Sequence, residues 1–190
     1  MNVILASASP RRKELIARIP GLHAQTHAAQ SEENAPFINP GWYACALARH
    51  KAEEVAARLD TDEAVVGADT IVVLDGKPLG KPADVNDAKR MLSSLSGREH
   101  TVITGVCVAD RRRTVCFYAE TAVALDELSE EFIRAYAESG SPLDKAGAYG
   151  IQDEMFAPHV IGIRGDRDNV IGLPVAALKK TLKEYFGWEE

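Results

Sequence analysis

Ser7-Ala8-Ser9-Pro10-Arg11-Arg12-Lys13-Glu14-Leu15 is the stretch of this sequence that most directly predicts its fold. It follows the apolar run Val3-Ile4-Leu5-Ala6, which indicates a short buried strand. Ser9 is a favourable N-cap, and Pro10 suits the first helical position, where a missing N–H leaves no hydrogen bond unmade. Apolar residues then recur at the spacing of one helix face. The stretch therefore predicts a strand, a tight turn and a helix.

The charges of this helix are unusual for their position. Arg11 and Arg12 lie in the first turn, where the helix dipole disfavours cations. A bound anion would resolve the conflict, because free N–H groups, the dipole and two guanidinium groups would all converge on it. Two solvated surface arginines are the plainer interpretation. The sequence favours the anion site.

Composition limits the class of protein. The 190 residues are 46% hydrophobic, which is enough for one sizeable core, and no linker, repeat or low-complexity tract divides the chain. We predict a single domain over residues 1–190 with two lobes. The net charge of −6 argues against a broad electrostatic surface for nucleic acid. Basic residues that bind anions are therefore expected to act locally.

The cysteines and the N-terminus indicate the compartment. Cys45, Cys107 and Cys116 are scattered through apolar stretches without metal-ligand spacing, as expected of reduced core residues. The N-terminus lacks the pattern of a signal peptide, and no apolar run approaches the roughly 20 residues that span a bilayer. The sequence therefore predicts a cytoplasmic protein without a membrane partner.

Capping signals and periodicity predict alternating helices and strands in the rest of the chain. Asn39-Pro40 opens a long helix, and Asp84 and Ser129 cap two more. Asp75-Gly76 and Asp110–Arg113 indicate hairpins. Helices are expected at residues 40–59, 84–95, 130–138 and 173–186, strands at 22–26, 63–74, 100–109, 114–125 and 159–163, and a rigid loop at 78–82.

Asp69 lies in the middle of the strongest predicted strand, 63–74, whose near-continuous apolar character suggests burial on both faces. An unpaired carboxylate there would cost several kcal/mol, so it must be paired, metal-bound or open to a cleft. Because no cationic partner is adjacent in sequence, a functional role is favoured over a structural ion pair. Gly67, two residues earlier on the same face, is expected to leave room for a ligand.

Several further residues carry more than one interpretation. Lys51 lies on the apolar stripe of its helix, so its ammonium either reaches the edge of the core or points into a cleft. Gly-Lys-Pro occurs at Lys77 and at Lys81, and neither copy is a P-loop. Glu33 lies in a polar segment and is, on the residues alone, an ordinary solvated acid. Asp144–Gln152 is punctuated by glycines that permit positive φ and close approach to a ligand, or form a plain loop.

Taken together, the motifs resemble the Maf family of nucleoside triphosphate pyrophosphatases over essentially the whole chain. The matching motifs are Ser7-x-Ser9-Pro10-Arg11-Arg12-x-Glu14-Leu15, Gly67–Val72, Gly80-Lys81-Pro82, Ser96-Gly97-Arg98-x-His100, Asp144–Gln152 and Gly172-Leu173-Pro174. The resemblance implies an elongated α/β fold in which a mixed central sheet is flanked by helices and two lobes enclose a deep cleft. It also implies hydrolysis of a nucleoside triphosphate to the monophosphate and pyrophosphate, with a divalent metal ion, Mg²⁺ or Mn²⁺.

Within that family the chain resembles the branch that acts on dTTP and UTP. Arg11, Thr70 and Gln152 match the positions thought to set this substrate choice. The amide of Gln152 offers both a donor and an acceptor to a pyrimidine edge, which lets a buried site reject the wrong base.

The resemblance also assigns catalytic roles. Asp69 is implied as the general base that activates a water for attack on the α-phosphorus, and Glu33 as a metal ligand or water-positioning residue. A variant in which Asp69 binds the metal and Glu33 is the base stays open, because an ordinary aspartate is a weak base. The groups implied to hold phosphates are Ser7, Arg11, Arg12, Lys51 and Lys81.

Two other classes of function compete with the enzyme. The family's association with septum formation suggests a non-catalytic regulator of cell division that acts through protein contacts. A nucleic-acid-binding module would need a basic stripe that this acidic chain lacks. The enzyme is favoured; its expected partner is the nucleotide substrate, and a homodimer is allowed.

Overall fold

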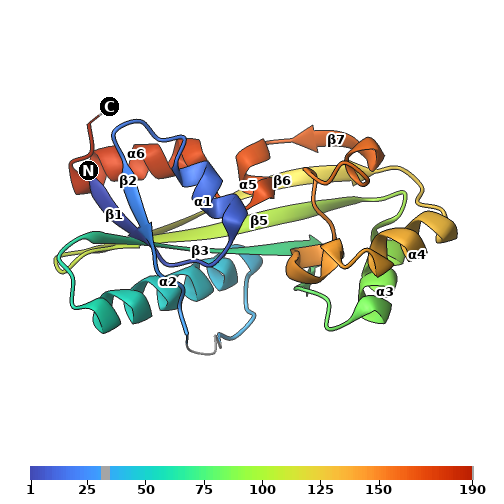
Figure 1. Ribbon diagram of the computed structural model, residues 1–190, viewed down its shortest axis with the longest axis horizontal. Helices are drawn as coiled ribbons and strands as arrows, with labels where there is room; N and C mark the ends of the chain where they lie inside the picture. Colours follow the sequence, from blue (N-terminus) through green and yellow to red (C-terminus); the bar gives the residue numbers. More distant parts are fainter. Residues whose placement is uncertain (31–34, 190) are drawn as a thin grey trace. The chain divides into compact units, whose positions relative to one another are not determined.

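The computed structural model describes residues 1–30 and 35–189, which form an α/β fold (Figure 1). A seven-stranded mixed sheet has the order β2-β1-β3-β5-β6-β7, and β4 pairs with β3. The mixed central sheet flanked by helices is therefore confirmed. The strands are β1 Asn2–Leu5, β2 His23–Thr26, β3 Ala64–Leu74, β4 Lys77–Leu79, β5 Glu99–Ala109, β6 Thr114–Leu125 and β7 Val160–Arg164. The helices are α1 Pro10–Ile16, α2 Pro40–Leu59, α3 Val85–Leu95, α4 Glu130–Glu138, α5 Arg167–Ile171 and α6 Val175–Phe186.

The chain forms two compact units. Unit 1 contains residues 1–70, 104–119 and 172–190, and unit 2 contains residues 71–103 and 120–171. The long strands β3, β5 and β6 each contribute residues to both. In the described ranges, no helix has both the length and the apolar composition needed to cross a membrane.

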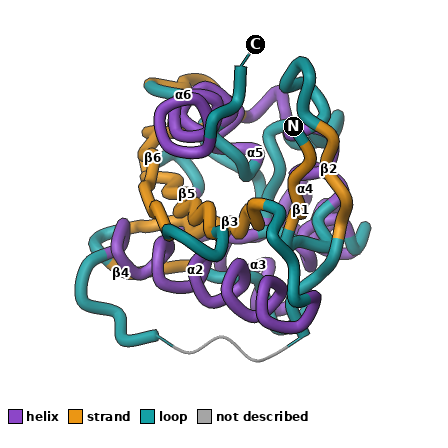
Figure 2. The backbone as a smooth tube through the Cα atoms, turned by 90° about the vertical axis from the view of Figure 1, so that its left-hand side faces the viewer, coloured by secondary structure: helices purple, strands orange, loops and turns teal. Residues whose placement is uncertain are grey.

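In unit 1, two parallel crossovers place helices on both faces of the sheet. β1 pairs in parallel with β2 on one side and with β3 on the other. α1 connects β1 to β2, and α2 connects β2 to β3. The chain therefore first moves from β1 to the edge strand β2, and then returns past β1 to β3 on its other side. Because such crossovers are right-handed, a reversal of direction puts the two helices on opposite faces. Figure 1 shows α1 above β3 and α2 below it, and Figure 2 shows α6 and α2 on opposite sides of the strands.

The α2 face of unit 1 is packed with small side chains. A buried cluster joins α2 to β1, β3 and β5, with members Ile4, Ala6, Ala48, Ala52, Val55, Val65, Cys107 and Ala109. Alanines on α2 let its backbone approach the sheet closely. At Gly67, a Cβ atom would lie 2.1 Å from the carbonyl oxygen of Ala48. The expectation that Gly67 leaves room for a ligand is therefore wrong, because the backbone of α2 occupies that space.

Replacing Gly67 with Ala should destabilise the protein by about 3 kcal/mol or more, because the added methyl cannot fit without moving α2 away from β3. Urea unfolding measures the change. Gly80→Ala is the matched control, since no atom lies within 4 Å of the position of its Cβ, and it should alter the free energy of unfolding little. Equal stability of the two variants would contradict the close approach of α2.

Unit 2 has its own core, formed where α3 and α4 pack side by side (Figure 1). Met91, Leu92 and Leu95 of α3 and Ile133 and Tyr136 of α4 are buried in it. The side chains of Asp84 and Ser129 cap these helices as predicted, each accepting a hydrogen bond from a backbone N–H in the first turn. The caps fix where the helices begin, and the apolar faces fix which side is buried.

Two short elements of unit 2 differ from the sequence-based expectation. The predicted loop at 78–82 begins as a strand, because Lys77–Leu79 pairs antiparallel with Val72–Leu74 to form β4. Residues Arg167–Ile171 form α5, which was not predicted. Its Asn169 is fully buried and donates to the carbonyl of Val102 and the hydroxyl of Thr121. Tertiary partners stabilise both elements, so periodicity over three to five residues could not reveal them.

Candidate active site

The topology of unit 1 marks one position on the sheet as a place for a ligand. Sheet order reverses at β1, with β2 on one side and β3 on the other. In open α/β sheets, ligands bind at such a switch point, outside the carboxyl ends of the strands. The pairing of β1 with β3 ends at Leu5 and Val66. Ser7 follows the end of β1, and Asp69 and Thr70 lie in the part of β3 that continues past this pairing. The predicted residues of the first and third strands are therefore brought to one edge.

Arg12 is the centre of the contacts on the α1 side. Its guanidinium donates from Nε to the carbonyl oxygen of Gly172 at 2.9 Å, from Nη1 to the Ser7 hydroxyl at 3.3 Å and from Nη2 to the Thr70 hydroxyl at 3.1 Å. The Thr70 hydroxyl is also 3.0 Å from that of Thr104, which is fully buried. These acceptors are neutral, so they orient the guanidinium without cancelling its charge.

The helix that carries Arg12 begins as its sequence predicts. The hydroxyl of Ser9 accepts from the backbone N–H of Arg12, and Pro10 occupies the first helical position. Arg11, in the same turn, is partly buried. The N-cap sets the direction of the first turn and so determines where both arginine side chains begin.

Asp69 and Lys51 form an ion pair on the α2 side. The ammonium of Lys51 lies 2.5 Å from Oδ1 of Asp69, and the two side chains are only 13% and 16% exposed. The same ammonium is 3.5 Å from the carbonyl oxygen of Ala68. Of the alternatives left open for Asp69, pairing is the one the structure shows, with a partner 18 residues earlier on α2. The pair offsets the cost of removing each charge from water.

Strand alternation separates these two sets of contacts. Successive side chains of a strand point to opposite faces, so Asp69 points toward α2 and Thr70 toward α1. On one face of β3, the Asp69 carboxylate is paired with the Lys51 ammonium. On the other face, the Thr70 hydroxyl accepts a hydrogen bond from the guanidinium of Arg12. A carboxylate can accept a proton from water, and a guanidinium can bind phosphate oxygens.

The remaining predicted residues lie elsewhere. Glu33 lies outside the described residues. Lys81 and Gln152 are exposed residues of unit 2. The backbone N–H of Gly147, which has a φ of +69°, donates to the carbonyl oxygen of Gly80 at 3.0 Å. The loop of Lys81 and the glycine-punctuated segment are therefore neighbours, although Gly80 and Gly147 are 67 residues apart in sequence.

A buried polar cluster holds the segment before Gln152. Lys145 is 9% exposed, and its ammonium donates to the carbonyl oxygen of Ser141 and to the carboxylate of Asp144. Asp153 accepts hydrogen bonds from the hydroxyls of Tyr136, at 2.6 Å, and Ser141, at 2.7 Å. Burial and the hydrogen bond to Asp153 raise the pKa of Tyr136 above its ordinary value, so this phenol stays a donor. Gln152 therefore extends from an anchored turn.

Sequence reasoning missed two groups of the Arg12 cluster. Thr104 carries a hydroxyl in the otherwise apolar run Val102–Val106. A polar group in such a run is the sequence signal that could have drawn attention to it. Gly172 was noted only as part of a motif. Its φ of +129° lies in the region that favours glycine, and its carbonyl oxygen is the acceptor for Nε of Arg12. Neither contact could be inferred from spacing, because the partners are 34 and 160 residues apart.

The donor set at this edge can take part in holding a hard divalent cation. Within residues 1–30 and 35–189, no three His, Cys, Asp or Glu side chains are grouped to hold a metal ion. Mg²⁺ typically needs only one or two protein carboxylates and completes its shell with substrate phosphates and water. The carboxylate of Asp69, which is 16% exposed, is of the ligand type that this mode of binding uses.

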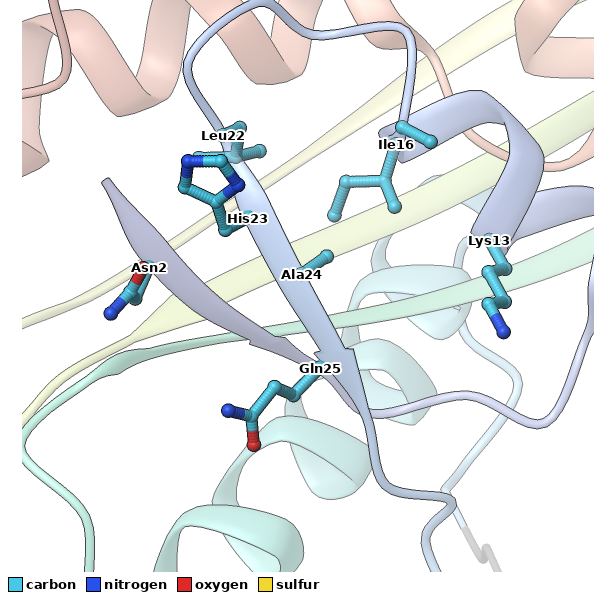
Figure 3. A pocket seen from close by; sticks show the side chains of 8 residues that line it. Asn2, Lys13, Ile16, Leu22, His23, Ala24 and Gln25 are labelled. Atoms are coloured by element: carbon cyan, nitrogen blue, oxygen red, sulfur yellow. The ribbon is translucent and has the colours of Figure 1, made fainter.

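A separate depression of about 350 Å³ lies between α1 and the edge strand β2 (Figure 3). Ile16, Leu22 and Ala24 supply apolar walls, and Lys13, His23 and Gln25 supply polar groups. None of the residues that line it belongs to the Arg12 cluster or to the Lys51–Asp69 pair.

Solved structures share the fold of this chain at low identity. The Ham1 protein of Staphylococcus aureus aligns with a TM-score of 0.54 and 15% identity, over 96% of this chain and 98% of that one. A HAM1 protein from Coxiella burnetii aligns with a TM-score of 0.51 and 14% identity, over 97% and 99%. These likenesses support the fold alone.

Sequence relatives are much closer. The dTTP/UTP pyrophosphatase of Agathobacter rectalis is 46% identical over 96% of this chain and 97% of its own length. Those of Chlorobaculum tepidum and Thermococcus kodakarensis are 43% and 45% identical, again over nearly the full length of both chains. The family model described as Maf-like protein matches residues 2–185. The motif-based resemblance is thereby confirmed, and the chain belongs to the Maf-like protein family.

Proposed function

We propose that this protein is a hydrolase that converts dTTP and UTP to the monophosphate and pyrophosphate. The observation that carries the proposal is the pairing of Lys51–Asp69 and Arg12–Thr70 on the two faces of one strand, in a chain about 45% identical to dTTP/UTP pyrophosphatases over their whole length. Phosphoryl-transfer chemistry depends mainly on positioning and charge stabilisation, which these groups can supply.

Asp69 is the proposed general base. Its carboxylate takes a proton from the water that attacks the α-phosphorus, and Lys51 holds the carboxylate in place through the ion pair at Oδ1. Lys51 also adds positive charge close to the reacting phosphate. If Asp69 instead ligates the metal, Glu33 is the proposed base.

Phosphate binding is proposed for the α1 side. Arg12 is already oriented by Gly172, Ser7 and Thr70, so little side-chain entropy is lost when it binds the substrate. Ser7 and Arg11 are proposed to bind phosphate oxygens beside it. Lys81 of unit 2 is proposed to complete the charge neutralisation of the triphosphate.

A divalent cation, Mg²⁺ or Mn²⁺, is the proposed cofactor, held by Asp69 and Glu33 together with phosphate oxygens. When bound, the ion neutralises phosphate charge and makes a bound water more acidic. A cytoplasmic protein that needs no nucleic acid or membrane, and that can form a homodimer, is the accompanying proposal.

The direct test is a panel of nucleoside triphosphates assayed for pyrophosphate. We expect pyrophosphate rather than orthophosphate from dTTP and UTP, faster than from purine triphosphates, and loss of the activity when a chelator removes divalent metal. Release of orthophosphate, or equal rates with and without metal, would contradict the proposal. A non-catalytic role in cell division would instead leave the purified protein inactive on every triphosphate.

Base selection is proposed for Arg11, Thr70 and Gln152. Replacing Gln152 with Ala should lower kcat/KM for dTTP and UTP by roughly 10- to 100-fold, because one or two hydrogen bonds to the base are lost. Rates for purine triphosphates should change much less. The exposed neighbour Glu154→Ala is the control and should leave the preference intact. A uniform loss across all substrates would show that Gln152 does not read the base.

A further inference from the structure

Two of the three cysteines are in contact. Cys107 lies on β5 and Cys116 on β6, and their thiols are hydrogen-bonded with the sulfur atoms 2.8 Å apart. The sequence predicts all three as reduced core residues, because they lie in apolar stretches and lack the spacing of metal ligands. The structure shows instead that the hairpin between β5 and β6 brings two of them together.

The hairpin explains why these two thiols meet. At its tip, the backbone N–H of Asp110 donates to the carbonyl oxygen of Arg113. Counting back from Asp110 and on from Arg113 by three residues each reaches Cys107 and Cys116, so the two cysteines are directly opposite. In antiparallel strands, opposite residues alternate between hydrogen-bonded and non-hydrogen-bonded pairs. By this count Cys107 and Cys116 are a non-hydrogen-bonded pair, and the Cα atoms of such pairs are typically about 4.5 Å apart. That spacing is within the roughly 4.4–6.8 Å that a disulfide requires.

The two thiols have different surroundings. Cys107 is fully buried, whereas Cys116 is partly exposed. The hydrogen bond with Cys107, aided by the positive charge of Arg49, holds the pKa of Cys116 below that of an ordinary thiol. The same hydrogen bond, together with burial, raises the pKa of Cys107. Cys116 is therefore the thiol that ionises first and that an oxidant can reach.

We propose that Cys107 and Cys116 form a reversible intramolecular disulfide and are a site of oxidative modification by hydrogen peroxide. The Cys116 thiolate attacks the peroxide oxygen, the O–O bond breaks, and hydroxide leaves and is protonated to water. Cys116 is then a sulfenic acid. The Cys107 thiol attacks that sulfur, the S–O bond breaks, and a second water leaves. Two thiols are oxidised and one hydrogen peroxide is reduced; a dithiol returns the pair to its starting state.

Cys45 provides the internal control. It lies on α2, and burial raises its pKa to about 12, so it remains a protonated thiol that neither attacks peroxide nor competes as a nucleophile. Arg49 and Glu53 of α2 act on the pKa of Cys116 in opposite directions and are joined to each other at 2.6 Å. The reaction is therefore confined to the β5–β6 pair.

The test is peptide mapping of the full-length, reduced protein after treatment with hydrogen peroxide. The folded protein is quenched with an alkylating reagent and digested. We expect a linkage between the peptides of Cys107 and Cys116, a loss of two hydrogen masses from the intact chain, and reversal by dithiothreitol. Cys45→Ala should form the same linkage.

Two variants decide the assignment. Cys116→Ser, at a partly exposed position, should abolish the linkage completely. Cys107→Ser keeps a hydroxyl that can donate to Cys116, and it should leave Cys116 as a sulfenic acid that a dimedone probe captures. A linkage that involves Cys45, a linkage only between two chains, or thiols that stay alkylatable at Cys116 throughout would overturn the proposal. Should Cys107→Ser fail to fold, the wild-type map and Cys116→Ser still give the answer.

Discussion

Asp69→Asn is expected to reduce pyrophosphate release from dTTP and UTP by roughly 10³-fold or more, because an amide can neither accept the proton of the attacking water nor bind a cation strongly. The amide has nearly the same shape as the carboxylate, so the backbone of β3 should be undisturbed. The loss should be in kcat, since Asp69 lies on the opposite face of β3 from the contacts of Arg12. Steady-state kinetics over a range of substrate concentrations measures the change.

Stability must be separated from catalysis in this variant. Removing the carboxylate breaks the ion pair with Lys51, whose side chain is only 13% exposed, and this lowers stability. The double variant Lys51→Met, Asp69→Asn removes both charges and should regain stability while staying inactive. Asp75→Asn, which removes an exposed ion pair with Arg98, is the matched control and should keep full activity. Near-normal activity of Asp69→Asn would rule out Asp69 both as base and as metal ligand.

Arg12→Met is expected to raise KM by roughly 100-fold and to lower kcat/KM at least as much, because a charge-assisted bidentate contact to phosphate is lost. Arg12→Lys should recover little of this. A lysine keeps the charge, but it cannot contact Gly172, Ser7 and Thr70 in three directions as the guanidinium does. Initial-rate kinetics and isothermal titration with a non-hydrolysable triphosphate give the two quantities.

The control for Arg12 comes from the same helix. Lys13→Met removes a positive charge from the next, exposed position and should change KM by no more than about twofold, the scale of screened surface charge. If both variants raised KM equally, the effect would be one of general electrostatic attraction rather than of a positioned guanidinium. Ser7→Ala should lie between them, because it removes one of the three acceptors that orient Arg12.

Local signals in the sequence predicted much of the fold. Ser9, Asn39, Asp84 and Ser129 each cap a helix whose first residue follows directly. The side chain of a cap accepts its hydrogen bond from a backbone N–H in the first turn of the same helix. Three or four consecutive residues are therefore enough to predict where the helix begins. The hairpin at Asp110–Arg113 was predictable for the same reason. The short elements β4 and α5 depend on distant partners and were therefore missed.

The sequence drew attention to Asp69, but it could not predict which residues contact one another. Asp69 stood out as an acid in an apolar strand, yet its partner Lys51 belongs to a helix that only tertiary structure brings to that face. Gly67 was misinterpreted because a missing side chain can make room for a ligand or for a helix, and the sequence does not distinguish them. Thr104 went unnoticed because a threonine is ordinary in a strand, and only its contact with Thr70 makes it informative.

The adjacency of Asp69 and Thr70 has a consequence for how this enzyme could diverge. The two residues are joined by one peptide bond, so any shift of the backbone that moves the Thr70 side chain on one face of β3 also moves the Asp69 carboxylate on the other. Inserting a single residue upstream of them would exchange the two faces altogether. New substrate preferences are therefore expected to evolve by exchanging side chains on a fixed frame, with insertions and deletions in this strand eliminated by selection.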